Sequence, residues 1–218
     1  MRLAELSERS GVPTATIKYY LRERLLPPGT RVTATQSEYG EEHLRRLRLV
    51  RALIQVGRMP VATAREVLAV TDDESLDENT RTGAAVWALP HGPEPDPEDP
   101  AVRDARAQVD EVLERMEWPY CRELGAASPA YGMLVTAIAS LGRLGYPHDT
   151  AHLLLHARLA GELAVADLDL VAGYPTPEER IEAAVALTVL YEPVLQSLRR
   201  LAQTEESYRR SPQTTTEK

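Results

Sequence analysis

The chain has 218 residues, which is enough for one large domain or for a small domain followed by a larger one. It contains a single cysteine, so an intramolecular disulfide and a thiolate-rich zinc site are both excluded. The net charge of −8 is unevenly distributed along the chain. Residues 1–70 carry 12 basic and 7 acidic side chains, whereas residues 71–218 carry 13 basic and 26 acidic ones. This asymmetry favours a nucleic-acid-binding head on an acidic body.

The first predicted elements are two short helices separated by a tight turn. Leu3 and Leu6 lie on one side of a helix over residues 3–9. In the turn that follows, Gly11 suits a left-handed backbone, and Pro13 then opens a second helix that runs to about residue 24. Helix, three-residue turn and helix is the spacing of a DNA-reading helix-turn-helix.

A small wing and a long helix are expected next. Residues 30–35 and 36–39 are rich in β-formers and predict two short strands. The long helix is predicted over residues 41–56, and its buried face is formed by Leu44, Leu47, Val50, Leu53 and Ile54. Its opposite, solvated face is expected to carry His43, Arg45, Arg46, Arg48 and Arg51. A second turn follows at residues 57–59, and Pro60 starts another short helix.

The composition changes after residue 70. Ser75 is expected to cap a helix over residues 76–89, with Glu78 as its capping-box partner. Helical spacing then recurs over residues 102–116, 131–144, 149–170 and 177–204. The predicted class is therefore mainly α, with a winged head and an all-α C-terminal domain. The predicted parts are a head over 1–70, a connecting helix and acidic proline-rich linker over 71–100, a helical domain over 101–206 and a disordered tail over 207–218.

Residues 1–70 resemble the DNA-binding head of the MerR family of transcription regulators. The matching pieces are Leu3-x-x-Leu6, Ser10-Gly11-Val12, Thr16-Ile17-Lys18-Tyr19-Tyr20, Leu25-Leu26-Pro27, Tyr39, and Leu44-x-x-Leu47 through Ile54-x-x-Gly57 to Ala64-x-x-x-Leu68. The sequence departs from the family pattern at two places, where Lys18 replaces the usual Arg and Gln36-Ser37 replaces a common Tyr-Arg. The resemblance implies a homodimer that binds a palindromic promoter site and distorts it so that RNA polymerase can engage.

The candidate DNA contacts lie mainly on the second helix and the wing. Thr14, Lys18 and Arg22 share one solvent face, and Lys18 is expected to donate to a guanine edge. The resemblance implies that one of the two adjacent tyrosines reaches a phosphate while the other packs in the head. Periodicity assigns Tyr20 to the core, so Tyr19 is the phosphate candidate. The full set of candidates is Thr14, Thr16, Lys18, Tyr19, Arg22, Arg31, Thr33, Tyr39 and Arg58, with Tyr39 equally interpretable as a packing residue.

The rear domain offers candidates for effector binding. Trp118, Tyr120, Tyr131 and Tyr191 are the aromatic side chains proposed to line a pocket for a small-molecule effector, although they are equally interpretable as core. His148, His152 and His156 recur every four residues, a spacing that suits a transition metal, but capping and packing explain them as well. No metal or other cofactor is expected.

The sequence thus predicts a cytoplasmic bacterial transcription regulator that binds double-stranded DNA as a homodimer. It carries no phosphate-binding glycine loop or nucleophile motif, so no enzyme is expected. The longest apolar stretch, residues 153–171, is interrupted by charged side chains, and no membrane association is expected. An architectural DNA-binding or adaptor protein and a metal-responsive regulator using the histidines are the alternatives. The dimer helix is either 177–204 or 102–116.

Overall fold

The computed structural model describes residues 1–33 and 36–211, and it confirms the mainly α class with one small antiparallel hairpin. The chain forms two compact units, which are described separately below. The first comprises residues 1–65 together with the chain from Glu182 onward, and the second comprises residues 66–181.

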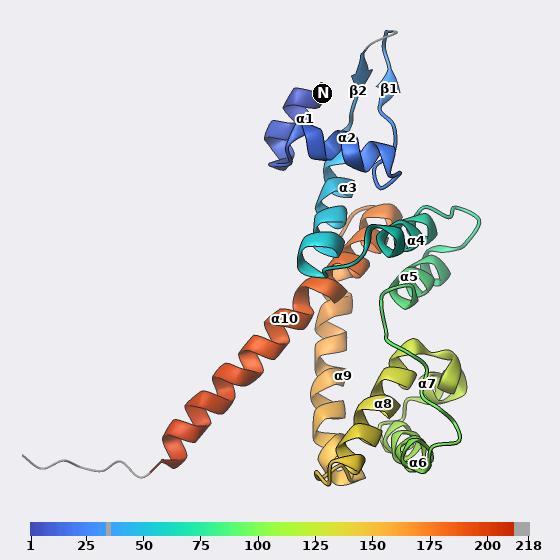
Figure 1. The fold of residues 1–218 in the computed structure, drawn as a ribbon, viewed down its shortest axis with the longest axis vertical. Helices are drawn as coiled ribbons and strands as arrows, with labels where there is room; N and C mark the ends of the chain where they lie inside the picture. The colour runs from blue at the N-terminus through green and yellow to red at the C-terminus, as the bar shows by residue number, and fades with distance from the viewer. Residues whose placement is uncertain (34–35, 212–218) are drawn as a thin grey trace, which may run out of the picture. The chain divides into compact units, whose positions relative to one another are not determined.

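The head of the first unit is assembled around one helix. Helices α1 (Leu3–Ser10) and α2 (Thr14–Arg22) lie across α3 (Glu41–Arg51), which continues as a π-helical turn (Ala52–Val56) (Figure 1). The turn between α1 and α2 contains Gly11 at φ 66°, in the left-handed region that glycine adopts without a Cβ penalty. The fully buried side chains of this head are Leu6, Ile17, Leu25, Leu26, Leu47, Leu49, Val50 and Leu53.

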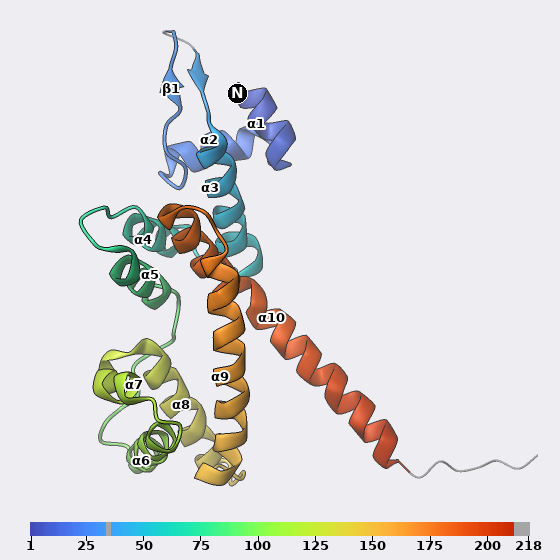
Figure 2. The same cartoon turned by 180° about the vertical axis from the view of Figure 1, so that it is seen from behind.

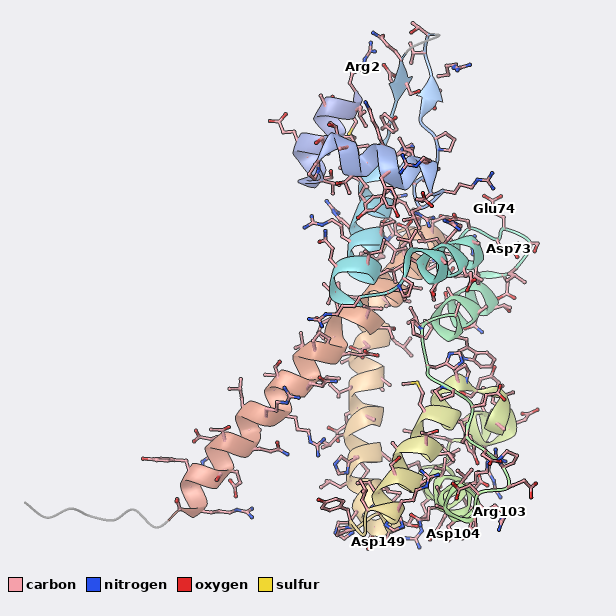
Figure 3. The ribbon with its side chains drawn as sticks, in the orientation of Figure 1. Arg2, Asp73, Glu74, Arg103, Asp104 and Asp149 are labelled. Atoms are coloured by element: carbon pink, nitrogen blue, oxygen red, sulfur yellow. The ribbon has the colours of Figure 1, made fainter. Side chains whose placement is uncertain are left out.

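The wing is shorter than the sequence predicts. Strands β1 (Thr30–Arg31) and β2 (Ser37–Glu38) pair antiparallel, and the part of the prediction that falls on residues 34–35 lies outside the described residues. The amino terminus is bound to the base of the wing, because the Met1 ammonium donates to the Tyr39 carbonyl at 2.8 Å. Arg2 lies beside the wing (Figure 3). Its guanidinium donates to the side-chain oxygen of Gln36. The chain start thus helps to position the wing.

The face of α3 opposite its predicted buried face is expected to be solvated, and this expectation is wrong at two positions. His43 and Arg46 are only 5% and 8% exposed. Helix α10 (Pro177–Arg210) returns to the first unit from residue 182 onward, and its Glu182 pairs with Arg46 at 3.3 Å. The approach is close enough that a Cβ on Gly57 would lie 2.8 Å from Val189. Arg46 is buried because a partner 136 positions later in the chain packs against α3.

The second unit is built on α6 (Pro100–Arg115), which packs against α8 (Pro129–Arg143) and α9 (Thr150–Ala172) (Figure 2). The remaining elements of this unit are α5 (Glu78–Trp87), α7 (Pro119–Leu124), a short 3₁₀ turn (Gly125–Ala127), the end of α4 (Val61–Thr71) and the first turn of α10. Its core consists of Val102, Ala105, Val109, Leu113, Val135, Ile138 and Ala139. The apolar face of α6 is therefore covered within one chain.

Helix α5 begins two residues later than the sequence predicts. Asp77, and not Ser75, caps it, because the Asp77 side chain accepts from the Thr80 amide at 3.1 Å. Ser75 instead donates its hydroxyl to Asp73 at 2.6 Å. Both residue types suit an N-cap, so the choice depends on where the helical backbone starts.

The compact units do not follow the expected boundaries. The first unit ends inside α4 and regains the last helix, whereas the boundaries at residues 70 and 100 were drawn from composition. Helix α10 continues to Arg210, so residues 207–210 are helical and do not belong to a tail. A functional division of the chain near residue 70 stays a prediction.

Candidate nucleic-acid interface

Helix α2 presents one polar face to solvent because its other face is anchored. Ile17 and Tyr20 are 0% and 5% exposed and hold the helix on the core of the head. Thr14, Lys18 and Arg22 are exposed, and Thr16 is half-buried. The predicted division of α2 into an inner and an outer face is confirmed by this burial.

The two adjacent tyrosines of α2 have different surroundings. Burial raises the pKa of Tyr20, which keeps its hydroxyl neutral in the core. Tyr19 is half-buried, and the Arg22 guanidinium carbon lies 5.2 Å from the centre of its ring. This cation–π contact holds Arg22 along the helix surface, where it also lies 3.7 Å from Glu23.

The wing candidates separate into exposed and buried residues. Arg31 and Thr33 are exposed, whereas Tyr39 is only 8% exposed and meets the His43 ring edge-on at 5.1 Å. This position favours the packing interpretation of Tyr39. Gly29 is required below the wing, since a Cβ there would lie 2.6 Å from the Glu38 carbonyl oxygen and 2.9 Å from the Tyr39 ring.

Arg58 lies in the short connection before α4. Its φ of 51° is in the left-handed region, which a non-glycine residue adopts at a cost. The side chain is exposed. In the described part of the chain, Lys18, Arg31 and Arg58 form no ion pair, so their charges are available to a phosphate.

Other basic residues of the head are bound within the protein. Arg9 pairs with Glu41 at 2.7 Å. Arg65 donates to both the carbonyl and the carboxylate of Glu23, at 2.8 and 3.0 Å, and thereby joins α4 to the end of α2. These pairs neutralise acidic groups beside α2. Unpaired positive charge therefore remains on α2, on the wing and before α4.

The four aromatic candidates for an effector site do not come together. Tyr131 donates to Asp110 at 2.9 Å, and with burial this contact raises the pKa of Tyr131 to about 12. Trp118 lines a different hollow beside Leu113, Tyr120 is 68% exposed, and Tyr191 belongs to the first unit. The sequence groups them only by residue type, because all four are aromatic.

The three histidines also do not form a metal site. His148 and His156 direct their Nδ1 atoms to backbone carbonyls, at 2.8 and 3.0 Å, and His152 directs its own to Asp149 at 2.9 Å. Across residues 1–33 and 36–211, no group of three or more His, Cys, Asp or Glu side chains is placed to hold a metal ion. The N-cap of α9 is Asp149 and not His148, and His152 and His156 are exposed, so neither capping by His148 nor packing of the other two describes these contacts.

The polar face of α2, the two-stranded wing and the supporting α3 define a winged helix-turn-helix. Residues 1–70 match the pattern of the MerR HTH family of regulatory proteins. The chain is also similar to the proposed transcriptional regulator SCO5550 from Streptomyces coelicolor A3(2), whose crystal structure superimposes with a TM-score of 0.82. The two sequences are 55% identical, over 96% of this chain and 97% of that one. No curated protein sequence matches the chain. The protein belongs to the MerR family and is a DNA-binding regulator.

Proposed function

We propose that the protein is a sequence-specific transcription regulator that binds a palindromic promoter site as a homodimer through α2. The observation that carries this proposal is the outward face of α2, where Lys18 and Arg22 lie exposed beside Thr14. A helix of this kind inserts its polar face into the major groove, where Lys18 donates to guanine O6 and N7. We expect Arg31, Thr33 and Arg58 to contact flanking phosphates.

The proposed dimer helix is the second half of α10. Exposed apolar side chains recur there with alternating steps of three and four residues at Tyr191, Val194, Leu198, Leu201 and Tyr208, with Glu205 between the last two. This alternation is typical of the seam of a two-stranded coiled coil. Helix α6, the other sequence candidate, has its apolar face covered by α8.

A second copy of α10 fits this seam in the antiparallel direction. If a twofold axis passes between Leu198 and Leu201, Leu198 of each copy meets Leu201 of the other copy. The same register sets Tyr191 opposite Tyr208 of the second copy. An isologous contact of this kind gives the two heads the symmetry of a palindromic site.

A membrane is the other apolar environment that α10 could enter. Helix α10 is long and apolar enough to span one, as is the bent pair α7–α8, although core helices of soluble proteins pass the same test. Arg199 and Arg200 lie in the middle of the exposed half and are costly in a bilayer. The seam therefore favours a protein partner and a soluble, cytoplasmic regulator.

Control of transcription completes the proposal. By its family membership, the dimer is expected to distort promoter DNA for RNA polymerase, and a small molecule bound to the second unit is expected to change this activity. In this proposal the head binds DNA and the second unit binds the effector. The charge of the second unit suits this division, because DNA repels an acidic body and is therefore contacted by the head.

The proposal is tested by the affinity of the purified protein for its own upstream DNA and for scrambled DNA of equal length, across a salt series. We expect tighter binding to the upstream DNA, with an affinity that falls about tenfold in Lys18→Ala. Arg115→Ala, on the rear helix α6, is the matched control and should bind as the wild type does. Equal binding to both DNAs would indicate an architectural protein, and no binding at low salt would overturn the proposal.

A further inference from the structure

The second unit contains a cavity of about 110 Å³ between α6, the start of α8 and the chain segment 91–95. The segment was predicted as a linker, but Pro95 lies against Gly132 of α8, 3.6 Å from where a Cβ would be. The lining side chains are mostly apolar and come from Pro93, Pro95, Ala126, Ala127, Pro129 and Met133, and the polar ones come from His91, Glu94, Arg106, Ser128 and Tyr131. All of them belong to one unit.

The guanidinium of Arg106 is the chemically unusual group in this cavity. Its Nε is buried and has no hydrogen-bond partner. In the part of the chain that the structure describes, no carboxylate lies within ion-pair distance of Arg106, although Glu94 also lines the cavity. Because Arg106 lines the cavity and forms no ion pair, an anion bound in the cavity gains a charge-assisted interaction with the guanidinium.

Tyr131 adds no charge to the cavity, whose charged lining side chains are Arg106 and Glu94. Its hydroxyl proton is engaged by Asp110, and its pKa of about 12 keeps the phenol neutral. Asp110 lies one helical turn from Arg106 on α6, and within the described residues the two side chains form no ion pair. The ring of Tyr131 therefore contributes an apolar wall beside an arginine that has no carboxylate partner.

We propose that this cavity binds a small aliphatic monocarboxylate, whose carboxylate pairs with Arg106 and whose hydrocarbon part lies among Met133 and the prolines. An apolar cavity of about 150 Å³ holds benzene, so 110 Å³ suits a ligand of about four to six heavy atoms. Arginine presents two parallel N–H donors that match the two oxygens of a carboxylate. The inference rests on the proposed function in one respect, since it makes this ligand the effector of the regulator.

The test uses the full-length protein with ¹³C-methyl-labelled methionine and no DNA. Met133 lines the cavity, whereas Met59 lies in the first unit and Met116 contacts the region of Gly161 on α9. Butyrate is titrated at constant ionic strength, with butyramide as the neutral probe of equal shape. We expect a saturable shift of the Met133 methyl with a Kd of about 1 mM, no shift of the methyls of Met1, Met59 and Met116, and at least tenfold weaker binding of butyramide.

Two arginine variants on α6 locate the site. Arg106→Gln should weaken butyrate binding at least tenfold, because it removes a charged hydrogen bond. Arg115→Gln should bind butyrate unchanged, since Arg115 is exposed and pairs with Glu111. Should Arg106→Gln fail to fold, the butyrate and butyramide titrations of the wild type decide the matter alone. The absence of a saturable Met133 shift, equal binding of the amide, or unchanged binding by a folded Arg106→Gln protein would overturn the proposal.

Binding to the cavity and binding to DNA are measured separately, so their failures are distinguishable. Butyrate binding with no selective DNA binding would leave the cavity proposal standing and overturn only the regulator. Selective DNA binding with no butyrate binding would leave the regulator standing and overturn the cavity proposal. If both hold, saturating butyrate should change the affinity for upstream DNA in the wild type and not in Arg106→Gln, and an unchanged wild-type affinity would overturn the effector role.

Discussion

The head and the second unit differ in how their basic side chains form ion pairs. On the head, Lys18, Arg31 and Arg58 are exposed and form no ion pair within the described residues. In the second unit, most basic side chains form ion pairs, as Arg180 does with Glu78 at 2.6 Å. Within the described residues, Arg103, Arg106 and Arg158 form none, and of these three only Arg106 is half-buried, with an Nε that lacks a hydrogen-bond partner. We therefore assign the exposed unpaired cations of the head to DNA and the half-buried Arg106 to a small anion.

The largest effect is expected from breaking the α10 seam. Leu198→Glu places a charge at its centre and should convert the dimer to a monomer, since a buried carboxylate is costly. Because two linked heads bind far more tightly than one, affinity for the upstream DNA should fall about 100-fold or more. Light scattering and a binding titration measure the two consequences.

The matched control is Gln196→Glu, which adds the same charge on the opposite side of the exposed half of α10. It should remain dimeric and bind DNA as the wild type does. If Leu198→Glu stays dimeric, the seam is not the interface.

The buried pair between α3 and α10 should matter for stability. Glu182 and Arg46 have side chains that are 16% and 10% exposed, so Glu182→Gln leaves a poorly solvated arginine. We expect a loss of about 2–3 kcal/mol in the free energy of unfolding. Chemical denaturation measures it, with the exposed Glu192→Gln on the same helix as the control. Equal stability of the two variants would show that the pair contributes little.

This pair also shows why part of the fold was predictable and part was not. Ile17 and Tyr20 were assigned to the core from local periodicity, and both are buried. Arg46 follows the same helical pattern as exposed arginines, and only a distant glutamate explains its burial. Arg106 carried no sequence signal, because the absence of a partner is a property of the folded unit. Local spacing predicts faces of helices, and tertiary partners decide what covers them.

A smaller effect is expected on the wing. Arg31→Ala removes one phosphate contact, so it should weaken binding to upstream and scrambled DNA by similar factors of less than about tenfold. The slope of log affinity against log salt should fall by about one unit. A change confined to the upstream DNA would show that Arg31 reads bases.

The smallest effect concerns the cap of α6. Arg143 and the Ala101 amide hold the pKa of Asp99 below its usual value. A depressed carboxyl pKa stabilises the fold above the unfolded pKa near 4, and the contribution is lost as pH falls through the folded value. Asp99→Asn should therefore unfold at a lower temperature than the wild type at pH 7, with the difference shrinking below about pH 4. A difference independent of pH would assign the effect to the cap alone.

The central claim is that two copies of α2 read two symmetric half-sites. Hydroxyl-radical footprinting on the upstream DNA tests this claim most directly. The wild type and Lys18→Ala are compared at protein concentrations that give equal occupancy of scrambled DNA. We expect two protected segments related by a twofold axis, both weakened by Lys18→Ala. A single protected segment, or symmetric protection unchanged by Lys18→Ala, would contradict the account.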